Sequence, residues 1–294
     1  MHSLLERLLA HTPVVTDGAI GTELQARGLE AGQCPDIWNL ARPAEVEALT
    51  REYVEAGSDI VLTNTFRGNR LALEAAGLAE RLEELNLAAV ELARRATGGR
   101  AVVFGCLGPS GKMVMMGEVN ESDLREVYAE QAKILAVAGV EGFAVETMAE
   151  LEEAKAALAA ALETWLPVAV SMVFDSGKDK DRTMTGVTPE RAARELTEAG
   201  AHIVGANCGR GIAGYLPVCQ RMHAATDLAV WIKPNAGLPE LVDGKATYRT
   251  TPREFAAFVP AVLQAGASFI GGCCGTTPEF VRAVAETARR WRRQ

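Results

Sequence analysis

Short apolar runs alternate with longer amphipathic segments along the whole chain, and this alternation limits the possible folds more than any other feature. There are eight apolar runs, at residues 14–18, 59–66, 101–108, 142–147, 167–174, 202–209, 229–237 and 268–275. They lack the period-two alternation of half-exposed strands, which favours strands buried on both faces of a parallel sheet covered by helices. Between them, helical periodicity predicts helices over 43–57, 80–98, 121–139, 251–266 and 277–291.

An Ala-Gly pair ends four of the helical segments shortly before the next apolar run, at residues 56–57, 138–139, 199–200 and 265–266. Glycine can adopt the left-handed conformation that closes a helix, so the pairs indicate a repeated βα unit. Eight such units in 294 residues fit a (β/α)8 barrel, which typically needs about 250. We expect an α/β fold with a single (β/α)8 TIM barrel over residues 1–294. A doubly wound sheet is the alternative, but no Gly-x-Gly-x-x-Gly motif follows the first run.

Composition excludes several classes of protein. The net charge of -8 and the pI near 5.2 oppose binding to nucleic acid, whose partners usually carry a basic patch. Six cysteines are too few for a disulfide scaffold, and the first residues do not resemble a signal peptide. No window approaches the 18 apolar residues of a membrane span. We therefore expect a cytoplasmic protein with reduced thiols and with neither nucleic-acid nor membrane partners.

Three cysteines stand at the ends of predicted strands, where barrels of this type carry their catalytic groups. Cys208 ends the sixth apolar run, and Cys273 and Cys274 end the eighth. Adjacent residues of a regular strand point to opposite faces, so both thiols can reach one point only if the flanking glycines break the strand. Three thiolates suit Zn2+, and three protein ligands are typical of a catalytic zinc with one open position. The alternative is that these cysteines are small hydrophobic core residues.

The chemistry of such a site indicates the substrate. Three thiolates make zinc a poor activator of water, but a substrate thiol that binds it loses its proton and stays nucleophilic, which favours alkyl transfer to sulfur. Asp17 and Glu146 end the first and fourth runs and could bind an ammonium group, although an ion pair with a structural Arg or Lys is equally open. Backbone N–H groups of residues 17–23 can hold a carboxylate. A thiol amino acid fits all three features.

Six stretches carry a family resemblance: residues 16–28, 56–66, 108–111, 206–209, 234–237 and 271–279. In these stretches the chain resembles the homocysteine S-methyltransferase family, most closely the N-terminal homocysteine-binding module of cobalamin-dependent methionine synthases. The resemblance covers nearly the whole chain. It implies a (β/α)8 barrel, zinc held by Cys208, Cys273 and Cys274, and methylation of homocysteine to methionine.

The resemblance also implies roles for substrate-binding residues. Asp17 and Glu146 would receive the amino group of homocysteine, and the backbone of Gly18 and Ala19 would lie near its carboxylate. Asn235 would fill the fourth zinc position when substrate is absent, with a turn cap at the strand end as the alternative.

The sequence leaves the methyl donor open. It contains no D-x-H-x-x-G cobalamin signature, so the donor is either a methyl-corrinoid on a separate protein or a small molecule such as S-methylmethionine, adenosylmethionine or betaine. The Met-rich segment 111–122 could shape the donor side or a protein interface, or simply pack on the barrel. Two rival functions remain. One is a phosphate-binding barrel lyase that uses Lys233 and Glu146; the other is a non-catalytic zinc- and thiol-binding subunit of a larger methyl-transfer complex.

Overall fold

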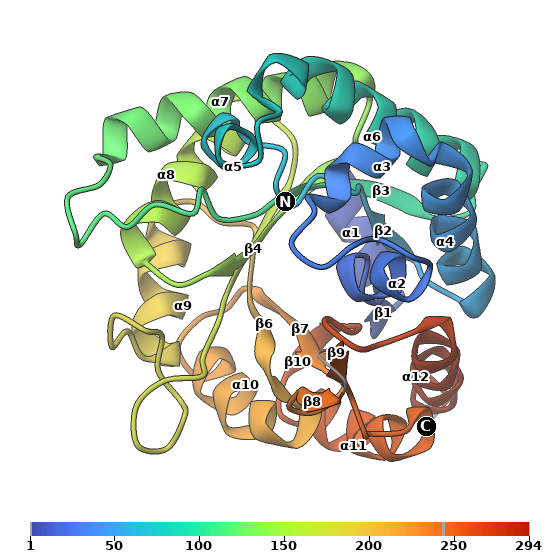
Figure 1. Ribbon diagram of the computed structural model, residues 1–294. Helices are drawn as coiled ribbons and strands as arrows, with labels where there is room; N and C mark the ends of the chain where they lie inside the picture. The colour runs from blue at the N-terminus through green and yellow to red at the C-terminus, as the bar shows by residue number, and fades with distance from the viewer. Residues whose placement is uncertain (1, 243–244, 294) are drawn as a thin grey trace.

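Eight parallel strands form the centre of the protein in the computed structural model, which describes residues 2–242 and 245–293 (Figure 1). The strands are β1 (Val14–Val15), β2 (Ile60–Leu62), β3 (Val102–Leu107), β4 (Gly142–Met148), β5 (Val168–Met172), β6 (Ile203–Gly211), β7 (Ala229–Asn235) and β10 (Ala267–Ile270). Their order is β1-β10-β7-β6-β5-β4-β3-β2, and a parallel bridge between Thr16 and Ile60 joins the two edges. The sheet therefore closes, and the predicted (β/α)8 TIM barrel is confirmed.

Helices surround the barrel, as Figure 1 shows. Those predicted from the sequence are α4 (Pro43–Ala56), α6 (Leu82–Thr97), α7 (Glu121–Ala138), α11 (Pro252–Gln264) and α12 (Pro278–Trp291). The others are α1 (Ser3–Leu9), α2 (Gly21–Ala26), α3 (Trp38–Ala41), α5 (Arg70–Ala75), α8 (Leu151–Leu162), α9 (Pro189–Glu198) and α10 (Leu216–His223), with short 3-10 turns η1 (Pro35–Ile37), η2 (Ala79–Arg81) and η3 (Ile212–Tyr215). The four predicted cap glycines, at 57, 139, 200 and 266, all have φ between 93° and 110°.

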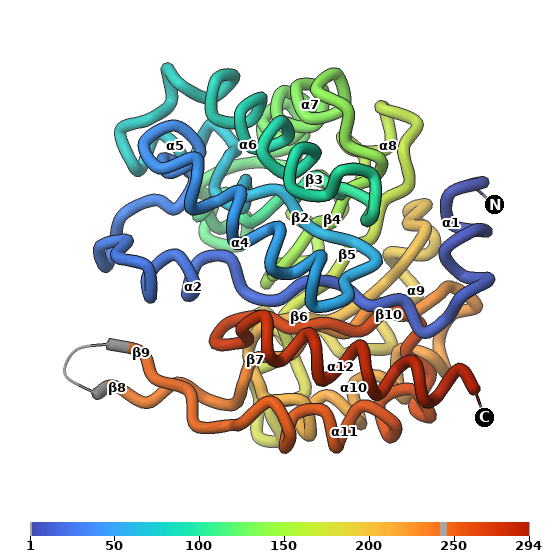
Figure 2. Tube along the Cα trace, turned by 90° about the vertical axis from the view of Figure 1, so that its right-hand side faces the viewer, coloured from blue at the N-terminus to red at the C-terminus, as the bar shows by residue number. Residues whose placement is uncertain are grey.

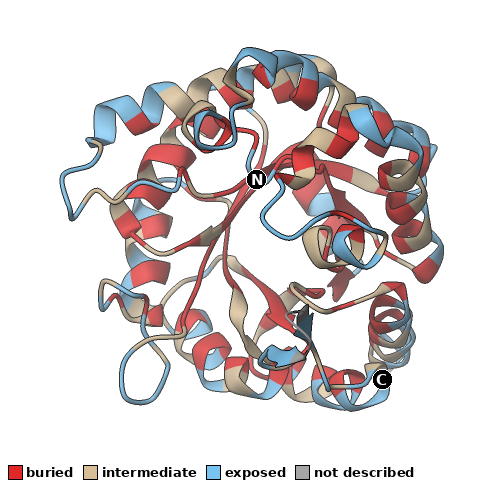
Figure 3. Cartoon of the chain, in the orientation of Figure 1, coloured by how far each residue is buried: buried red, intermediate tan, exposed pale blue. Residues whose placement is uncertain are grey.

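The barrel interior is a packed apolar core rather than a channel. Trp231 lies at its centre, stacked on Phe104 at 6.3 Å and on Phe269 at 5.3 Å between ring centroids. Leucines of α1 join this inner cluster, and a larger apolar layer lies between the strands and the outer helices (Figure 3). The interior is thus filled with apolar side chains, and the site must lie where the strands end.

An antiparallel hairpin that the sequence analysis did not predict follows β7, with strands β8 (Glu240–Val242) and β9 (Lys245–Thr247). Figure 2 shows it projecting from one end of the barrel, opposite the end that carries α1. Each of its strands has only three residues, too few to show a hydrophobic period.

None of the helices in the described part of the chain is both long and apolar enough to cross a membrane.

Candidate active site

Three sulfur atoms meet at the carboxyl ends of β6 and β10. The Sγ atoms of Cys208, Cys273 and Cys274 all lie within 4.8 Å of one another, and those of Cys208 and Cys274 are 3.8 Å apart. All three residues are partly buried. The expected convergence of these thiols is confirmed, while their function as zinc ligands stays a prediction at this point.

A strained backbone directs the first of these thiols. Cys208 has a φ of +64° and is followed by Gly209 at +57°, so β6 loses its regular register with β7 there. A left-handed conformation at a non-glycine residue costs about 1–3 kcal/mol, so surrounding contacts must hold it. The Tyr215 hydroxyl lies 2.9 Å from the carbonyl oxygens of both Asn207 and Cys208 and can donate to them. Residue types gave no signal of this strain in the sequence.

The other two thiols lie after the regular part of β10, which ends at Ile270. The backbone there still contacts β7, since the Cys273 N–H donates to the carbonyl of Pro234 at 2.8 Å. Gly275 follows Cys274 with a φ of +79°, and the ring of Tyr248 packs directly on it. A Cβ atom at Gly275 would lie only 2.2 Å from that ring, so only glycine fits. The predicted break of the strand is confirmed, and Tyr248 is a neighbour of the cluster that sequence reasoning missed.

The donor set of this cluster fits zinc. Hydrogen bonds from the Cys273 and Cys274 thiols lower the pKa of Cys208 well below its ordinary value, so the cluster readily provides a thiolate. Asn235 lies beside Cys208, and its side-chain oxygen is buried without a hydrogen-bond partner. Three soft sulfur donors suit a zinc site with an exchangeable fourth position, and a role of Asn235 in that position stays a prediction.

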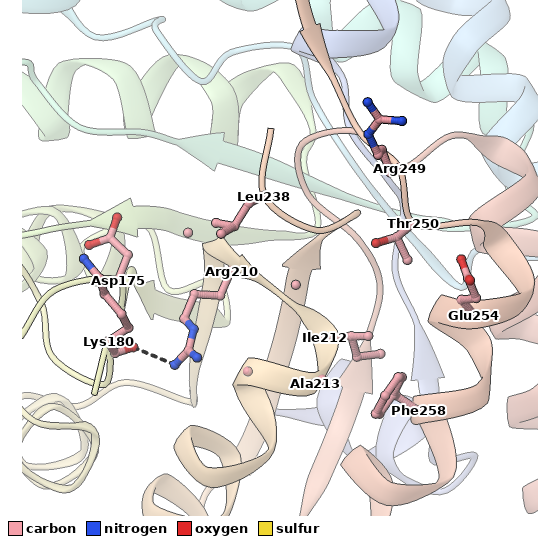
Figure 4. Close-up of a pocket in the computed structure, with 13 residues that line it drawn as sticks. Asp175, Lys180, Arg210, Ile212, Ala213, Leu238, Arg249, Thr250, Glu254 and Phe258 are labelled. Carbon is pink, nitrogen blue, oxygen red and sulfur yellow. Dashed lines mark hydrogen bonds between the residues drawn. The ribbon is translucent and has the colours of Figure 1, made fainter. Parts of the chain in front are cut away.

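The cluster forms part of the wall of a pocket with a volume of about 360 Å³. Other walls are formed by Gly18 and Ala19 after β1, by Leu62 at the end of β2 and Phe66 after it, and by Cys106, Glu146, Thr147 and Lys233. This volume lies at the lower end of the range for ligand pockets, which suits a substrate of amino-acid size. A larger and more open hollow of about 910 Å³ is lined by residues that follow Cys208, including Arg210 and Ile212, and by Lys180, Leu238 and Phe258 (Figure 4).

Lys233 of β7 carries a buried positive charge beside the two predicted substrate carboxylates. Its Nζ donates to Asp17 Oδ1 at 2.7 Å and lies 3.4 Å from Glu146 Oε1. The second oxygen of Asp17 accepts from the Leu62 N–H at 2.7 Å, so both oxygens have protein partners. The ion pair that the sequence left open for Asp17 is therefore present, and its direct contact with substrate stays a prediction.

Glu146, unlike Asp17, still has an oxygen without a hydrogen-bond partner. Its Oε1 is buried and, despite its proximity to Lys233, makes no aligned hydrogen bond; its Oε2 lies 3.8 Å from the thiol of Cys106. Burial raises the pKa of Glu146 to about 7, with the charge of Lys233 opposing that rise. An ammonium group in the pocket would supply the missing partner.

The turn after β1 is shaped by close packing. A Cβ atom at Gly18 would lie 2.7 Å from the Tyr53 ring, so the close approach requires glycine. The Ala19 N–H donates to the carbonyl of Thr276 at 3.1 Å and is thus used by the fold. Both residues line the pocket, and their contact with a substrate carboxylate stays a prediction.

The Met-rich segment 111–122 is anchored at its centre. The N–H groups of Val114 and Met115 donate to the carboxylate of Glu150 at 2.7 and 3.0 Å. The side chains of Met115 and Met116 are 62% and 68% exposed, whereas Val114 and Val119 of the same segment pack against the apolar core. Packing on the barrel therefore accounts for part of the segment, and a role of the exposed methionines on the donor side or in an interface stays open.

Comparison with known proteins assigns the family. Residues 14–288 match the homocysteine S-methyltransferase family. The methionine synthases of Mycobacterium tuberculosis and Mycobacterium leprae are each 32% identical to this chain, over 95% and 98% of it. The chain belongs to the homocysteine S-methyltransferase family. It spans only about 25% of the length of these two synthases.

Solved structures resemble this homocysteine S-methyltransferase family member in fold. The homocysteine methyltransferase MmuM from Escherichia coli, in its metallated form, has a TM-score of 0.80 and 24% identity, covering 96% of this chain and 99% of that one. The carboxyl transferase domain of Rhizobium etli pyruvate carboxylase has a TM-score of 0.56 and 15% identity, covering 97% of this chain and 49% of that one. These likenesses concern the barrel alone.

The alternative of a phosphate-binding lyase that uses Lys233 and Glu146 gains no support, since the Lys233 ammonium group pairs with the carboxylates of Asp17 and Glu146.

The raised pKa of Glu146 predicts a pH dependence of stability in metal-free protein. Between the ordinary value of 4.5 and about 7, the folded state keeps a proton that the unfolded state has released, so stability falls as pH rises. Urea unfolding of wild type and Glu146→Gln across this window should show the wild type losing stability relative to the variant as pH increases. Parallel curves would contradict the assignment.

Proposed function

We propose that this protein is a zinc-dependent homocysteine S-methyltransferase that converts homocysteine into methionine. The observation that carries the proposal is the cluster of Cys208, Cys273 and Cys274 in the wall of a pocket that also contains the incompletely paired Glu146. Membership of the homocysteine S-methyltransferase family supports the same activity. The pocket therefore has a place for each end of a thiol amino acid.

The three cysteines would hold zinc through their sulfurs, and Asn235 would occupy the fourth position until substrate arrives. Bound here, zinc would supply the Lewis acidity that favours the thiolate form of the substrate, since a free thiol with a pKa near ~8.5 is mostly protonated at neutral pH. The thiol proton would pass to solvent. The buried amide oxygen of Asn235 has no hydrogen-bond partner in the protein, so it would be free to serve as an exchangeable ligand.

Residues of the pocket orient the rest of homocysteine. Glu146 would accept hydrogen bonds from the ammonium group, whose charge favours the ionised carboxylate. Lys233 keeps Asp17 in place and balances one of the two negative charges, so the substrate ammonium balances the other. The turn at Gly18 would face the substrate carboxylate. These contacts hold the sulfur in position for attack.

The transfer itself needs no protein nucleophile. A lone pair of the substrate sulfur forms the new bond to the methyl carbon, and the donor keeps the electron pair of the bond that breaks. Apolar neighbours such as Leu62 and Phe66 limit the access of water to the sulfur. The donor belongs to one of four classes: a methyl-corrinoid on a partner protein, S-methylmethionine, adenosylmethionine or betaine.

A donor screen tests the proposal. Zinc-loaded protein is mixed with homocysteine and each donor in turn, methylcobalamin serving for the corrinoid class both free and on a corrinoid protein, and methionine is measured by mass spectrometry. We expect methionine from at least one donor, and loss of that activity after zinc is chelated. Protein that binds zinc and homocysteine but yields no methionine with any donor would instead favour the non-catalytic subunit.

Substituting Glu146 by glutamine should mainly weaken substrate binding. The variant keeps the shape of the side chain but loses the charge, and a hydrogen bond to a charged group contributes about 1.5–3 kcal/mol, or roughly 10- to 100-fold in affinity. Steady-state kinetics should show KM for homocysteine raised by about this factor. Glu153→Gln is the matched control, because Glu153 is buried but bonds Ser110 and Tyr128 and does not line the pocket. An unchanged KM in Glu146→Gln would remove its proposed role.

A further inference from the structure

The side chain of Asn207 has every hydrogen-bonding group in use. It is fully buried in β6, one residue before Cys208. Its Oδ1 accepts from the Ser171 hydroxyl at 2.5 Å and from the Thr147 N–H at 2.8 Å. Its Nδ2 donates to Thr147 Oγ1 at 2.7 Å and points to the sulfur of Cys273 at 3.8 Å. A carboxamide offers two donors and two acceptor positions, so no capacity remains.

One end of this network holds a strained backbone. Thr147 has a φ of +63°, which is unusual for a β-branched residue and costs about 1–3 kcal/mol. It follows Glu146 directly, at the point where β4 loses its register with β5 between Val145 and Met148. Asn207 hydrogen-bonds both the N–H and the hydroxyl of Thr147, so it holds the backbone turn that follows Glu146, a residue that lines the pocket.

The other end reaches the sulfur cluster. The Nδ2 group of Asn207 supplies an N–H to Cys273, which lies after β10, while Thr147 lies on β4. In the sheet, β6 has β5 and β4 on one side and β7 and β10 on the other, so the side chain of Asn207 connects a residue of β4 with a residue that follows β10. An N–H that points at a metal-binding sulfur stabilises the thiolate form of that sulfur and helps to fix its orientation.

We propose that Asn207 is a positioning residue that couples the zinc-binding sulfur of Cys273 to the turn that orients Glu146. The inference rests on the proposed function and deepens it. Because both ends of the substrate are held by groups that this amide fixes, Asn207 sets the distance between the sulfur site and the ammonium site. It touches neither substrate nor reacting atoms in this account.

Three substitutions separate the two ends of the coupling. Asn207→Asp keeps the acceptor for Thr147 but replaces the N–H near Cys273 by an oxygen, so zinc affinity should fall by about 10- to 100-fold while homocysteine affinity changes little. Thr147→Gly removes the side chain that Asn207 grips and frees the turn, so it should weaken homocysteine by about 10-fold or more and leave zinc affinity unchanged. Asn207→Ala should weaken both ligands.

The measurements use binding alone. Zinc affinity comes from competition with a chelator on metal-free protein, and the homocysteine dissociation constant comes from calorimetry on zinc-saturated protein. Ser171→Ala is the control: it removes a hydrogen bond to Asn207 without touching Cys273 or Thr147, and both affinities should stay within about twofold of wild type.

The proposal is overturned if Asn207→Asp binds zinc as tightly as wild type, or if Thr147→Gly binds homocysteine as tightly as wild type. Equal losses of both ligands in Ser171→Ala would also overturn it, because they would show a merely structural network. Asn207→Asp and Thr147→Gly decide the question even if Asn207→Ala fails to fold. Wild-type protein that binds both ligands but methylates nothing would refute the proposed function and leave this comparison valid.

Discussion

Replacing Cys208, Cys273 or Cys274 by alanine is expected to remove zinc binding and homocysteine methylation together. The three sulfurs lie within 4.8 Å of one another, and two thiolates cannot complete the ligand set of a stable site. We expect kcat/KM to fall by roughly 1,000-fold or more, equivalent to about 4 kcal/mol of transition-state stabilisation. Metal content by mass spectrometry and methionine formation in the donor screen give the two readouts.

Cys219→Ala provides the matched control for these substitutions. Cys219 is buried in α10, and its thiol contacts the carbonyls of Val262 and Ala265 rather than the cluster. The same chemical change there should leave zinc content and activity unchanged, at a modest cost in stability. Retention of full activity in any of the three cluster variants would refute the zinc site.

Lys233→Met is expected to destabilise the fold strongly. The substitution leaves the carboxylates of Asp17 and Glu146 buried near each other without a counter-charge, and removing one partner of a buried ion pair typically costs about 3–5 kcal/mol. Urea unfolding at neutral pH should therefore give a much lower midpoint than in wild type. Adding Asp17→Asn to this variant removes one of the stranded charges and should restore part of the loss.

Lys155→Met is the comparison for that experiment, because Lys155 pairs with Glu195 at a partly exposed position. Exposed pairs contribute about 0–1 kcal/mol, so the same substitution should have a small effect there. If both lysine variants unfolded at the same urea concentration, the buried charge arrangement in the pocket would have no special energetic importance.

The charges of the pocket also bear on which substrate fits. Lys233 balances one of two buried carboxylates, and Glu146 retains an oxygen without an aligned partner. A substrate with an ammonium group completes this arrangement, whereas a simple alkyl thiol leaves it incomplete. Asp17 already accepts hydrogen bonds on both oxygens, whereas Glu146 has only the longer contact with Lys233 at 3.4 Å and the thiol of Cys106.

Periodicity along the sequence determined the fold and the positions of most elements. Apolar runs without alternation predict strands buried on both faces, and Ala-Gly pairs mark where helices end; both signals depend on neighbours along the chain. Glycines 57, 139, 200 and 266 adopt the expected left-handed conformation. The hairpin of β8 and β9 was missed because its strands are short.

The sequence alone also placed the three cysteines at strand ends, and closure of the barrel was enough to predict that they meet. Only the tertiary structure decided which partners surround them. The pairing of Lys233 with Asp17 and the contacts of Asn207 join residues that are far apart in the sequence. The left-handed backbone at Thr147 and Cys208 is held by contacts of the same kind. Such contacts depend on side-chain direction and on strain held by distant groups, and no local pattern in the sequence records either of them.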